Sequence, residues 1–260
     1  MKRKVVLVTG GSRGIGKAIV TDFANKGYDV VINYKKSDEE AKKLKEELEK
    51  IYNIKALAIK ADVSNEDEVQ NMIKLIIKEF DKIDVLVNNA GIAIDKEFEE
   101  RTVKDWQLTL NTNLIASFIV SKYVGSEMLK NKSGKIINIS STNGINAFFP
   151  TSIDYDASKA GLISLTHNLA IQFAPYINVN CVAPGWVNTD MNKNLPKELI
   201  EEETNRIYKK RFAKPSEIAK VVAFLASEDA DFINDEIIKV DGGYSVKKQT
   251  IRNRKTNNSS

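Results

Sequence analysis

The chain has 260 residues, of which 42% are hydrophobic and 28% charged, as in an ordinary globular domain. The net charge of +4 is small and much of the excess lies in the tail, so it gives little support for binding nucleic acid. One cysteine excludes an internal disulfide, and one histidine argues against a zinc site built on His and Cys. No apolar run reaches the length of a signal peptide core or a membrane span, so we expect a cytoplasmic protein.

Short apolar runs alternate along the chain with longer segments of helical periodicity. The runs are rich in β-branched residues and end in glycine or polar residues, as strands buried on both faces do. Their alternation with helices predicts one α/β domain over 1–246, with a parallel sheet covered on both faces. The polar tail 247–260 is expected to be disordered. Strands are predicted at 4–10, 29–34, 54–63, 83–91, 134–140, 177–185 and 236–243, and helices at 14–27, 37–52, 64–80, 102–131, 154–174 and 215–227.

The turn after the first predicted strand reads "TGGSRGIG" and contains three glycines with the spacing G-x-x-x-G-x-G. Glycine permits a tight turn and lets a pyrophosphate approach the backbone, while the following helix offers free N–H groups. A plain strand-to-helix turn is the alternative, but it does not require three glycines. The turn therefore predicts a dinucleotide site, with contacts from Gly10, Ser12, Arg13, Gly14, Ile15 and Gly16.

The end of the second predicted strand, "INYKKSDE", bears on which nicotinamide cofactor binds. A site for NAD usually has an acidic residue there, whereas a basic residue accommodates the 2′-phosphate of NADP. No acid stands at the expected place, and Arg13 and Lys35 could both reach a phosphate. The alternative for Lys35 is a solvated loop. The pattern favours NADP over NAD, with Asn33, Tyr34 and Lys35 as candidate contacts.

Motifs over residues 3–245 resemble those of the classical short-chain dehydrogenases/reductases. Each motif is weak alone, but their order and spacing together are specific. The resemblance implies a single-domain Rossmann fold with a seven-stranded parallel sheet. It also implies an NADP(H)-dependent enzyme that interconverts a carbonyl and a secondary alcohol. The motifs are "TGGSRGIG" (9–16), "ADV" (61–63), "NNAG" (88–91), "NTNL" (111–114), "ISS" (139–141), "YDASK" (155–159), "PGWVNTDM" (184–191) and "VDGG" (240–243).

The resemblance implies a catalytic tetrad of Asn113, Ser141, Tyr155 and Lys159. Tyr155 would be the proton donor, and Lys159, one helical turn later, would lower its pKa and hold the cofactor ribose. Ser141 would donate a hydrogen bond to the substrate oxygen. Asn113 would bend its helix and hold a water that links Lys159 to solvent. No metal is implied.

Two of these assignments leave an alternative open. Ser141 is preferred to Ser140 because it lies 14 residues before Tyr155, as the family pattern requires with one inserted residue. Asn113 is preferred to Asn111 because it directly precedes the leucine of the family's N-L-x-x-x-F pattern.

The resemblance also implies cofactor contacts from three later segments. The adenine pocket would be bounded by Asp62 and Val63. The ribose and the central sheet would be lined by Asn89, Ala90 and Gly91. The nicotinamide would be bordered by Pro184, Gly185, Val187 and Thr189.

The segment 190–214 lies where this family has its substrate lid. Apolar residues, among them Tyr208 and Phe212, could form the inner face of that lid. Trp186 either walls the pocket or is simply a packed aromatic residue. His167 and Cys181 are interpreted as structural rather than catalytic.

Within the family the chain most resembles the 3-oxoacyl-acyl-carrier-protein reductases, through "NNAGIAIDKEF" and "YDASKAGLISLT". Lys132 could contact an acidic carrier, but 173–178 lacks the second basic residue of that subgroup. The alternatives are a glucose or other polyol dehydrogenase, suggested by "VVINYKKSDEEA", and a nucleotide-binding regulator without catalysis. The resemblance implies a homotetramer that takes a small carbonyl or alcohol substrate, free or carrier-bound, without nucleic acid or membrane.

Overall fold

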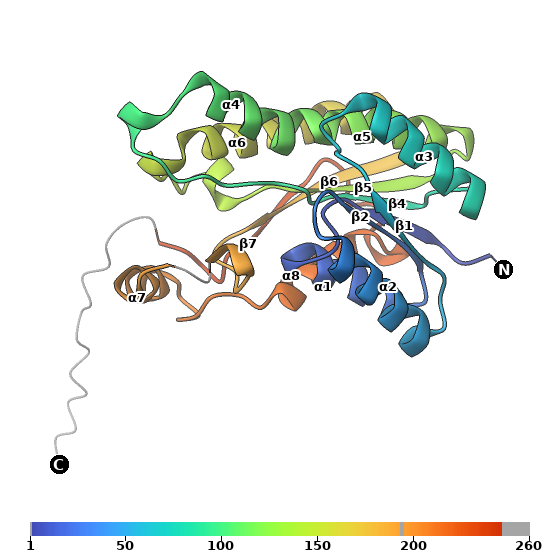
Figure 1. Ribbon diagram of the computed structural model, residues 1–260, viewed down its shortest axis with the longest axis horizontal. Helices are drawn as coiled ribbons and strands as arrows, with labels where there is room; N and C mark the ends of the chain where they lie inside the picture. The colour runs from blue at the N-terminus through green and yellow to red at the C-terminus, as the bar shows by residue number, and fades with distance from the viewer. Residues whose placement is uncertain (1, 193–194, 246–260) are drawn as a thin grey trace, which may run out of the picture.

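The computed structural model describes residues 2–192 and 195–245, so the predicted tail 247–260 lies outside the described residues. Seven parallel strands form one sheet in the order β3-β2-β1-β4-β5-β6-β7 (Figure 1). This confirms the predicted Rossmann fold. All strands except β2 are shorter than predicted. They are β1 (Val5–Val8), β2 (Asp29–Tyr34), β3 (Ala56–Lys60), β4 (Val85–Asn88), β5 (Gly134–Ile139), β6 (Ile177–Pro184) and β7 (Ile237–Val240).

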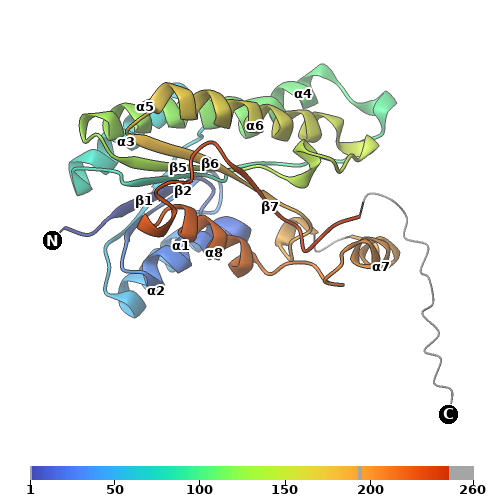
Figure 2. The ribbon, with the colours of Figure 1, turned by 180° about the vertical axis from the view of Figure 1, so that it is seen from behind.

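Helices cover both faces of the sheet, as Figure 2 shows from behind. On β1, Val6 and Val8 join one apolar core while Val5 and Leu7 join the other, because successive side chains of a strand point to opposite faces. One face is covered by α1 (Gly14–Asn25), α2 (Asp38–Tyr52) and α8 (Pro215–Leu225), and the other by α3 (Glu66–Phe80), α5 (Ala116–Lys130) and α6 (Ile153–Phe173).

The helix predicted over 102–131 is divided. Thr102 and Asp105 form a capping box that begins α4 (Val103–Leu110), and a π-helical turn, η2 (Asn111–Ile115), separates α4 from α5. A π turn inside a helix inserts an extra residue and is frequent at functional sites. It places Asn113 at the break.

The lid segment contains the helix α7 (Lys197–Arg206), which lies apart from the layers that cover the sheet (Figure 1). Phe212 is buried as predicted, but Tyr208 is 63% exposed, so its assignment to the inner face is wrong. Short 3-10 helices complete the described part of the chain: η1 (Phe98–Glu100), η3 (Thr142–Gly144), η4 (Pro150–Ser152), η5 (Asp190–Asn192) and η6 (Glu228–Ala230).

The two residues interpreted as structural, Cys181 and His167, lie in different surroundings. Cys181 is fully buried in β6. His167 contacts Asp235 near the surface, about 18 Å along α6 from Tyr155 at the usual helical rise. Across 2–192 and 195–245, no helix is both long and apolar enough to span a membrane.

Candidate active site

The glycine turn joins β1 to α1 in a shape that only glycine adopts easily. Gly10 and Gly14 have φ angles of +62° and +55°, and a Cβ on Gly16 would lie 2.2 Å from the carbonyl oxygen of Gly10. The N-cap residue Arg13 makes no capping hydrogen bond, and the first turn of α1 contains no acidic side chain. The N–H groups at this helix end are thus available to an anion, which fits a pyrophosphate.

Two asparagine side chains hold this turn in place. Asn89 Nδ2 donates to the carbonyl oxygens of Thr9 and Gly10 at 2.9 and 3.1 Å. Asn33 Oδ1 accepts from the Gly10 N–H at 3.4 Å, and its Nδ2 donates to the Ala61 carbonyl oxygen at 3.0 Å. Both residues were predicted to contact a cofactor, and both side chains bind main chain that shapes the turn.

Two residues predicted for different parts of the cofactor form an ion pair. Lys35 Nζ lies 2.5 Å from Oδ2 of Asp62. The hydroxyl of the neighbouring Tyr34 donates to Asp38, and burial together with this bond raises the Tyr34 pKa to about 12. Val63, the other residue predicted at the adenine pocket, is buried. A phosphate near Lys35 would therefore compete with the Asp62 carboxylate.

The segment after β6 runs from the sheet towards the glycine turn. The Gly185 N–H donates to the carbonyl oxygen of Val240, at the end of β7. Val187 is buried and pairs with Ala213, which returns from the lid. A Cβ on Gly14 would lie 3.7 Å from Cγ2 of Thr189, so the predicted nicotinamide segment adjoins the predicted pyrophosphate turn.

Tyr155 lies in the first turn of α6, with the Ser141 hydroxyl close enough to affect its pKa. Ser141 follows β5 and is buried. The alternative, Ser140, donates instead to the main-chain carbonyl of Lys159 at 2.8 Å. Of the two serines that the motif left open, Ser141 is therefore the one beside Tyr155.

The electrostatics of Tyr155 differ from the expectation. Burial raises its pKa to about 12, although the neighbouring Ser141 hydroxyl acts to lower it. Lys159 Nζ lies 5.5 Å from the centre of the Tyr155 ring and donates to the Ile139 carbonyl oxygen at 2.8 Å. Burial also lowers the pKa of Lys159 to about 8. The expected lowering of the Tyr155 pKa is wrong for the protein alone, because burial outweighs every favourable interaction.

Asn113 is fully buried at the π turn, and its side-chain amide binds protein groups. Oδ1 accepts from the Ile92 N–H at 2.8 Å, while Nδ2 donates to the Ile92 carbonyl at 2.9 Å and to Ser158 Oγ at 3.0 Å. Neither amide proton is left for the expected water. A Cβ on Gly91 would lie 3.5 Å from Lys159 Nζ, so this glycine leaves space beside the ammonium.

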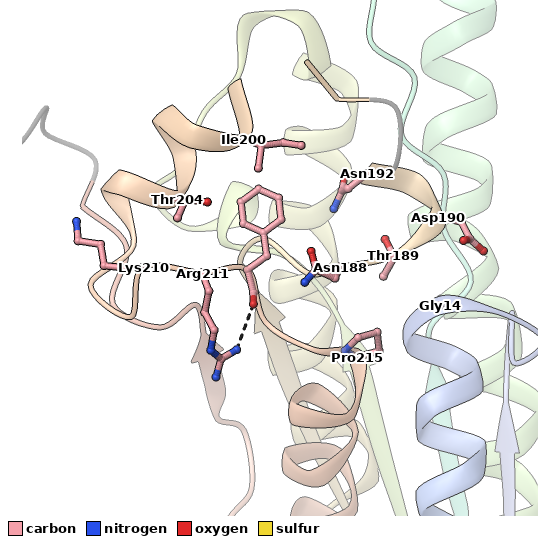
Figure 3. A pocket seen from close by; sticks show the side chains of 11 residues that line it. Gly14, Asn188, Thr189, Asp190, Asn192, Ile200, Thr204, Lys210, Arg211 and Pro215 are labelled. Atoms are coloured by element: carbon pink, nitrogen blue, oxygen red, sulfur yellow. Dashed lines mark hydrogen bonds between the residues drawn. The ribbon is translucent and has the colours of Figure 1, made fainter. Parts of the chain in front are cut away.

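A cavity of about 590 Å³ lies between the glycine turn and the lid (Figure 3). Figure 3 shows Ile200 and Thr204 on the lid side and Gly14 at the start of α1 on the other. Tyr155 and Ser141 do not line this cavity, which therefore adjoins the predicted cofactor side rather than the reacting groups. Its lining is Gly14, Asn188, Thr189, Asp190, Asn192, Ile200, Thr204, Lys210, Arg211, Phe212 and Pro215.

Trp186, which the sequence left open as a pocket wall or a packed aromatic residue, lies in a cluster that includes Glu203 and Tyr244, which the sequence did not predict. The indole stacks on Phe212 with ring centres 5.3 Å apart and meets Phe149 edge-on at 5.8 Å. Its Nε1 donates to Oε2 of the buried Glu203 at 2.8 Å, and the Tyr244 hydroxyl donates to the same oxygen at 2.6 Å. No local signal distinguishes Glu203 from the two glutamates before it, because its partners come from distant segments.

Comparisons with known proteins agree with this geometry. A family model described as "Enoyl-(Acyl carrier protein) reductase" matches residues 10–245. The chain is 41% identical over 241 residues to the 3-oxoacyl-[acyl-carrier-protein] reductase FabG of Staphylococcus epidermidis, covering 92% of this chain and 98% of that one. It is 40% identical to FabG of Aquifex aeolicus over 244 residues, covering 94% and 98%.

Solved structures give the same result. A doubly substituted short-chain dehydrogenase/reductase of Serratia marcescens superposes with a TM-score of 0.88 at 35% identity, covering 93% of this chain and 98% of that one. A dehydrogenase/reductase from Sinorhizobium meliloti gives 0.87 at 33% identity, with 94% and 95% covered. The chain therefore belongs to the short-chain dehydrogenase/reductase family of oxidoreductases.

Proposed function

We propose that the protein is an NADPH-dependent reductase of 3-oxoacyl thioesters carried on acyl carrier protein. The observation that carries the proposal is the pair of hydroxyls on Ser141 and Tyr155, with Lys159 beside the space at Gly91. Relatives at about 41% identity across nearly the whole chain are named for this reaction. The family model is named for enoyl reduction instead, but two neighbouring hydroxyl donors suit a carbonyl oxygen.

Each residue has a defined task in the proposed reaction. NADPH supplies a hydride to the carbonyl carbon. Tyr155 gives its proton to the oxygen, and Ser141 donates a hydrogen bond to that oxygen as negative charge develops. A Tyr155 pKa of about 12 keeps the hydroxyl protonated at neutral pH, which is the form that reduction requires. Lys159 holds the ribose hydroxyls, and Asn113 anchors the loop at Ile92 through both ends of its side-chain amide.

The proposal is tested by initial rates with NADPH on a panel of substrates. The panel contains acetoacetyl thioester on acyl carrier protein and on coenzyme A, a trans-2-enoyl thioester, and glucose with NADP⁺. We expect NADPH oxidation with the 3-oxoacyl thioesters, and a loss of about 1,000-fold in Tyr155→Phe with NADPH binding retained.

Other outcomes of the panel contradict the proposal. Turnover of glucose alone would instead support a polyol dehydrogenase. NADPH binding without turnover of any substrate would support a regulator that has lost catalysis.

Cofactor choice has its own test, because the two basic residues differ in their surroundings. Arg13 is exposed and has no ion pair with a described residue, whereas Lys35 is paired with Asp62. We expect Arg13→Ala to raise the Kd for NADPH about tenfold and Lys35→Ala to raise it less, with little effect on NADH. A wild-type preference for NADH would contradict the assignment.

Two partner interactions belong to the proposal. Lys132 is exposed, with Nζ 5.8 Å from the Tyr176 ring centre, and is the residue we assign to the acidic carrier. Lys132→Glu should then raise KM for the carrier-bound substrate but not for the coenzyme A thioester. A homotetramer is supported by exposed apolar side chains on α4, η2, α5 and α6, and light scattering would measure it. These side chains are Leu108, Ile115, Phe118 and Ile171.

A further inference from the structure

Three side chains form a hydrogen-bonded chain that ends at the Ser141 hydroxyl. Ser141 Oγ donates to Oδ1 of Asn143 at 3.1 Å and accepts from the main-chain N–H of Asn143 at 3.2 Å. Asn143 Nδ2 donates in turn to Oδ1 of Asp156 at 2.6 Å. Asp156 directly follows Tyr155 in α6, so the chain connects the segments that carry the two hydroxyls.

Asp156 is itself held from two further points. Its Oδ2 accepts from the Phe149 N–H at 3.1 Å, and its Oδ1 accepts from Ser152 Oγ at 3.3 Å. Each of these hydrogen-bonding partners of the carboxylate is therefore a donor. Burial raises the pKa of Asp156, while the hydrogen bonds from Asn143, Phe149 and Ser152 oppose that rise and the nearby Asp154 adds to it.

This arrangement permits only one orientation of the Asn143 amide. An ionised carboxylate only accepts hydrogen bonds, so Nδ2 must face Asp156 and Oδ1 must face Ser141. The reversed amide would bring two acceptors together. Asp156 thereby decides which atom of Asn143 the Ser141 hydroxyl meets.

The consequence for Ser141 is a hydroxyl whose oxygen and proton both have a defined position. An unrestrained serine hydroxyl samples three staggered rotamers. Here the Asn143 N–H fixes the oxygen, and the proton points to a neutral amide oxygen. A substrate oxygen that gains negative charge is the stronger acceptor, because charge-assisted hydrogen bonds are about twice as strong as neutral ones. The Ser141 hydroxyl, which keeps its proton, would turn its hydrogen bond from Asn143 to the substrate oxygen as that charge develops, which favours the transition state over the ground state.

We propose that Asn143 and Asp156 are positioning residues for carbonyl reduction, which hold the Ser141 hydroxyl ready for the substrate oxygen and act only through Ser141. The inference rests on the proposed function, since it requires a carbonyl oxygen beside Ser141.

A double-mutant cycle of Asn143→Ala and Ser141→Ala tests it. We expect Ser141→Ala to lower kcat about 100-fold and Asn143→Ala to lower it about tenfold, with the Kd for NADPH unchanged. In the Ser141→Ala background, Asn143→Ala should change kcat less than twofold, because its effect needs the hydroxyl. Asp156→Asn keeps the side-chain shape and should behave in the same way with a smaller single effect. Asp156→Asn replaces Asn143→Ala in the double-mutant cycle if Asn143→Ala does not fold.

Asn146→Ala is the matched control. Asn146 lies in the same loop as Asn143, and its side chain makes no hydrogen bond to a described residue. The variant should leave kcat within twofold. Additive losses in the cycle would overturn the inference, since a residue with a general structural role costs the same in both backgrounds. A single loss below twofold would overturn it as well. A wild-type protein inactive on the whole panel would remove the proposed function and this inference together, whereas an active wild type with additive losses removes the inference alone.

Discussion

The two sides of the candidate site are built in different ways. Around the glycine turn, shape comes from side chains that are missing and from amides that bind main chain, as at Gly16 and Asn89. Around Trp186, shape comes from side chains that meet from distant segments, with Glu203 at their centre. A site shaped by the backbone can be predicted from a short stretch of sequence. A site shaped by contacts between distant side chains can be identified only in the folded protein.

Adding a side chain in the glycine turn should have the largest effect on cofactor binding and stability. In Gly16→Ala the new methyl would meet the Gly10 carbonyl at 2.2 Å and Asn89 Nδ2 at 2.6 Å, so the turn has to move. We expect NADPH affinity to fall at least about 100-fold and stability to fall by about 1–3 kcal/mol, as for other overpacked sites. Fluorescence titration and urea denaturation measure both.

The control for this variant is Gly27→Ala, which also lies at positive φ but has no atom within 4 Å of its Cβ position. It should cost about 1–2 kcal/mol of stability through backbone strain and leave NADPH affinity unchanged. Normal NADPH binding in Gly16→Ala would show that the turn does not form the cofactor site.

Removing the Glu203 carboxylate from the cluster around Trp186 should change substrate binding instead of cofactor binding. Glu203→Ala leaves the Trp186 N–H and the Tyr244 hydroxyl without their acceptor, at a cost of about 2–5 kcal/mol. We expect the KM for the 3-oxoacyl thioester to rise while the Kd for NADPH stays the same. The neighbouring Glu202→Ala removes an exposed ion pair with Arg206 and should cost less than about 1 kcal/mol. Equal effects of the two variants on KM would contradict the distinction between the two sides.

The smallest expected effect concerns the buried Lys159, beside Tyr155. Burial lowers its pKa in the folded protein to about 8, whereas the unfolded chain keeps the ordinary value of 10.5. Between these values the unfolded state binds more protons, so stability rises with pH. Relative to Lys159→Met, the wild type should gain roughly 1 kcal/mol between pH 7 and pH 9 in urea denaturation. A constant difference between the two proteins would show that the folded state does not depress this pKa.

Local patterns in the sequence were enough to predict the sheet and much of the candidate site. Alternating β-branched runs and amphipathic helices predicted the seven-stranded sheet, because burial on both faces leaves a distinct signature in each strand. The motifs also brought Ser141, Tyr155 and Lys159 to one place. Contacts between distant side chains, such as the ion pair of Lys35 with Asp62, could not be predicted in this way.

The same limit explains the electrostatic error at Tyr155. A lysine one turn away is visible in the sequence, and it suggests a lowered pKa. How deeply the ring is buried depends on the packing of β5, η3 and α6 around it, which no local pattern reveals. The Asn143–Asp156 contact could not be predicted either, because its residues lie 13 positions apart on different elements.

The π turn at η2 limits which deletions the segment from α4 to α5 can tolerate. An α-helix advances by about 100° per residue, so the extra residue rotates the face of α4 relative to that of α5. Deleting one residue there would restore a continuous α-helix. It would also turn α4 about its axis and draw the Asn113 amide away from Ile92. The π turn therefore sets the angle between the faces of α4 and α5, and a regular helix at this point would be incompatible with the contact between Asn113 and the loop that follows β4.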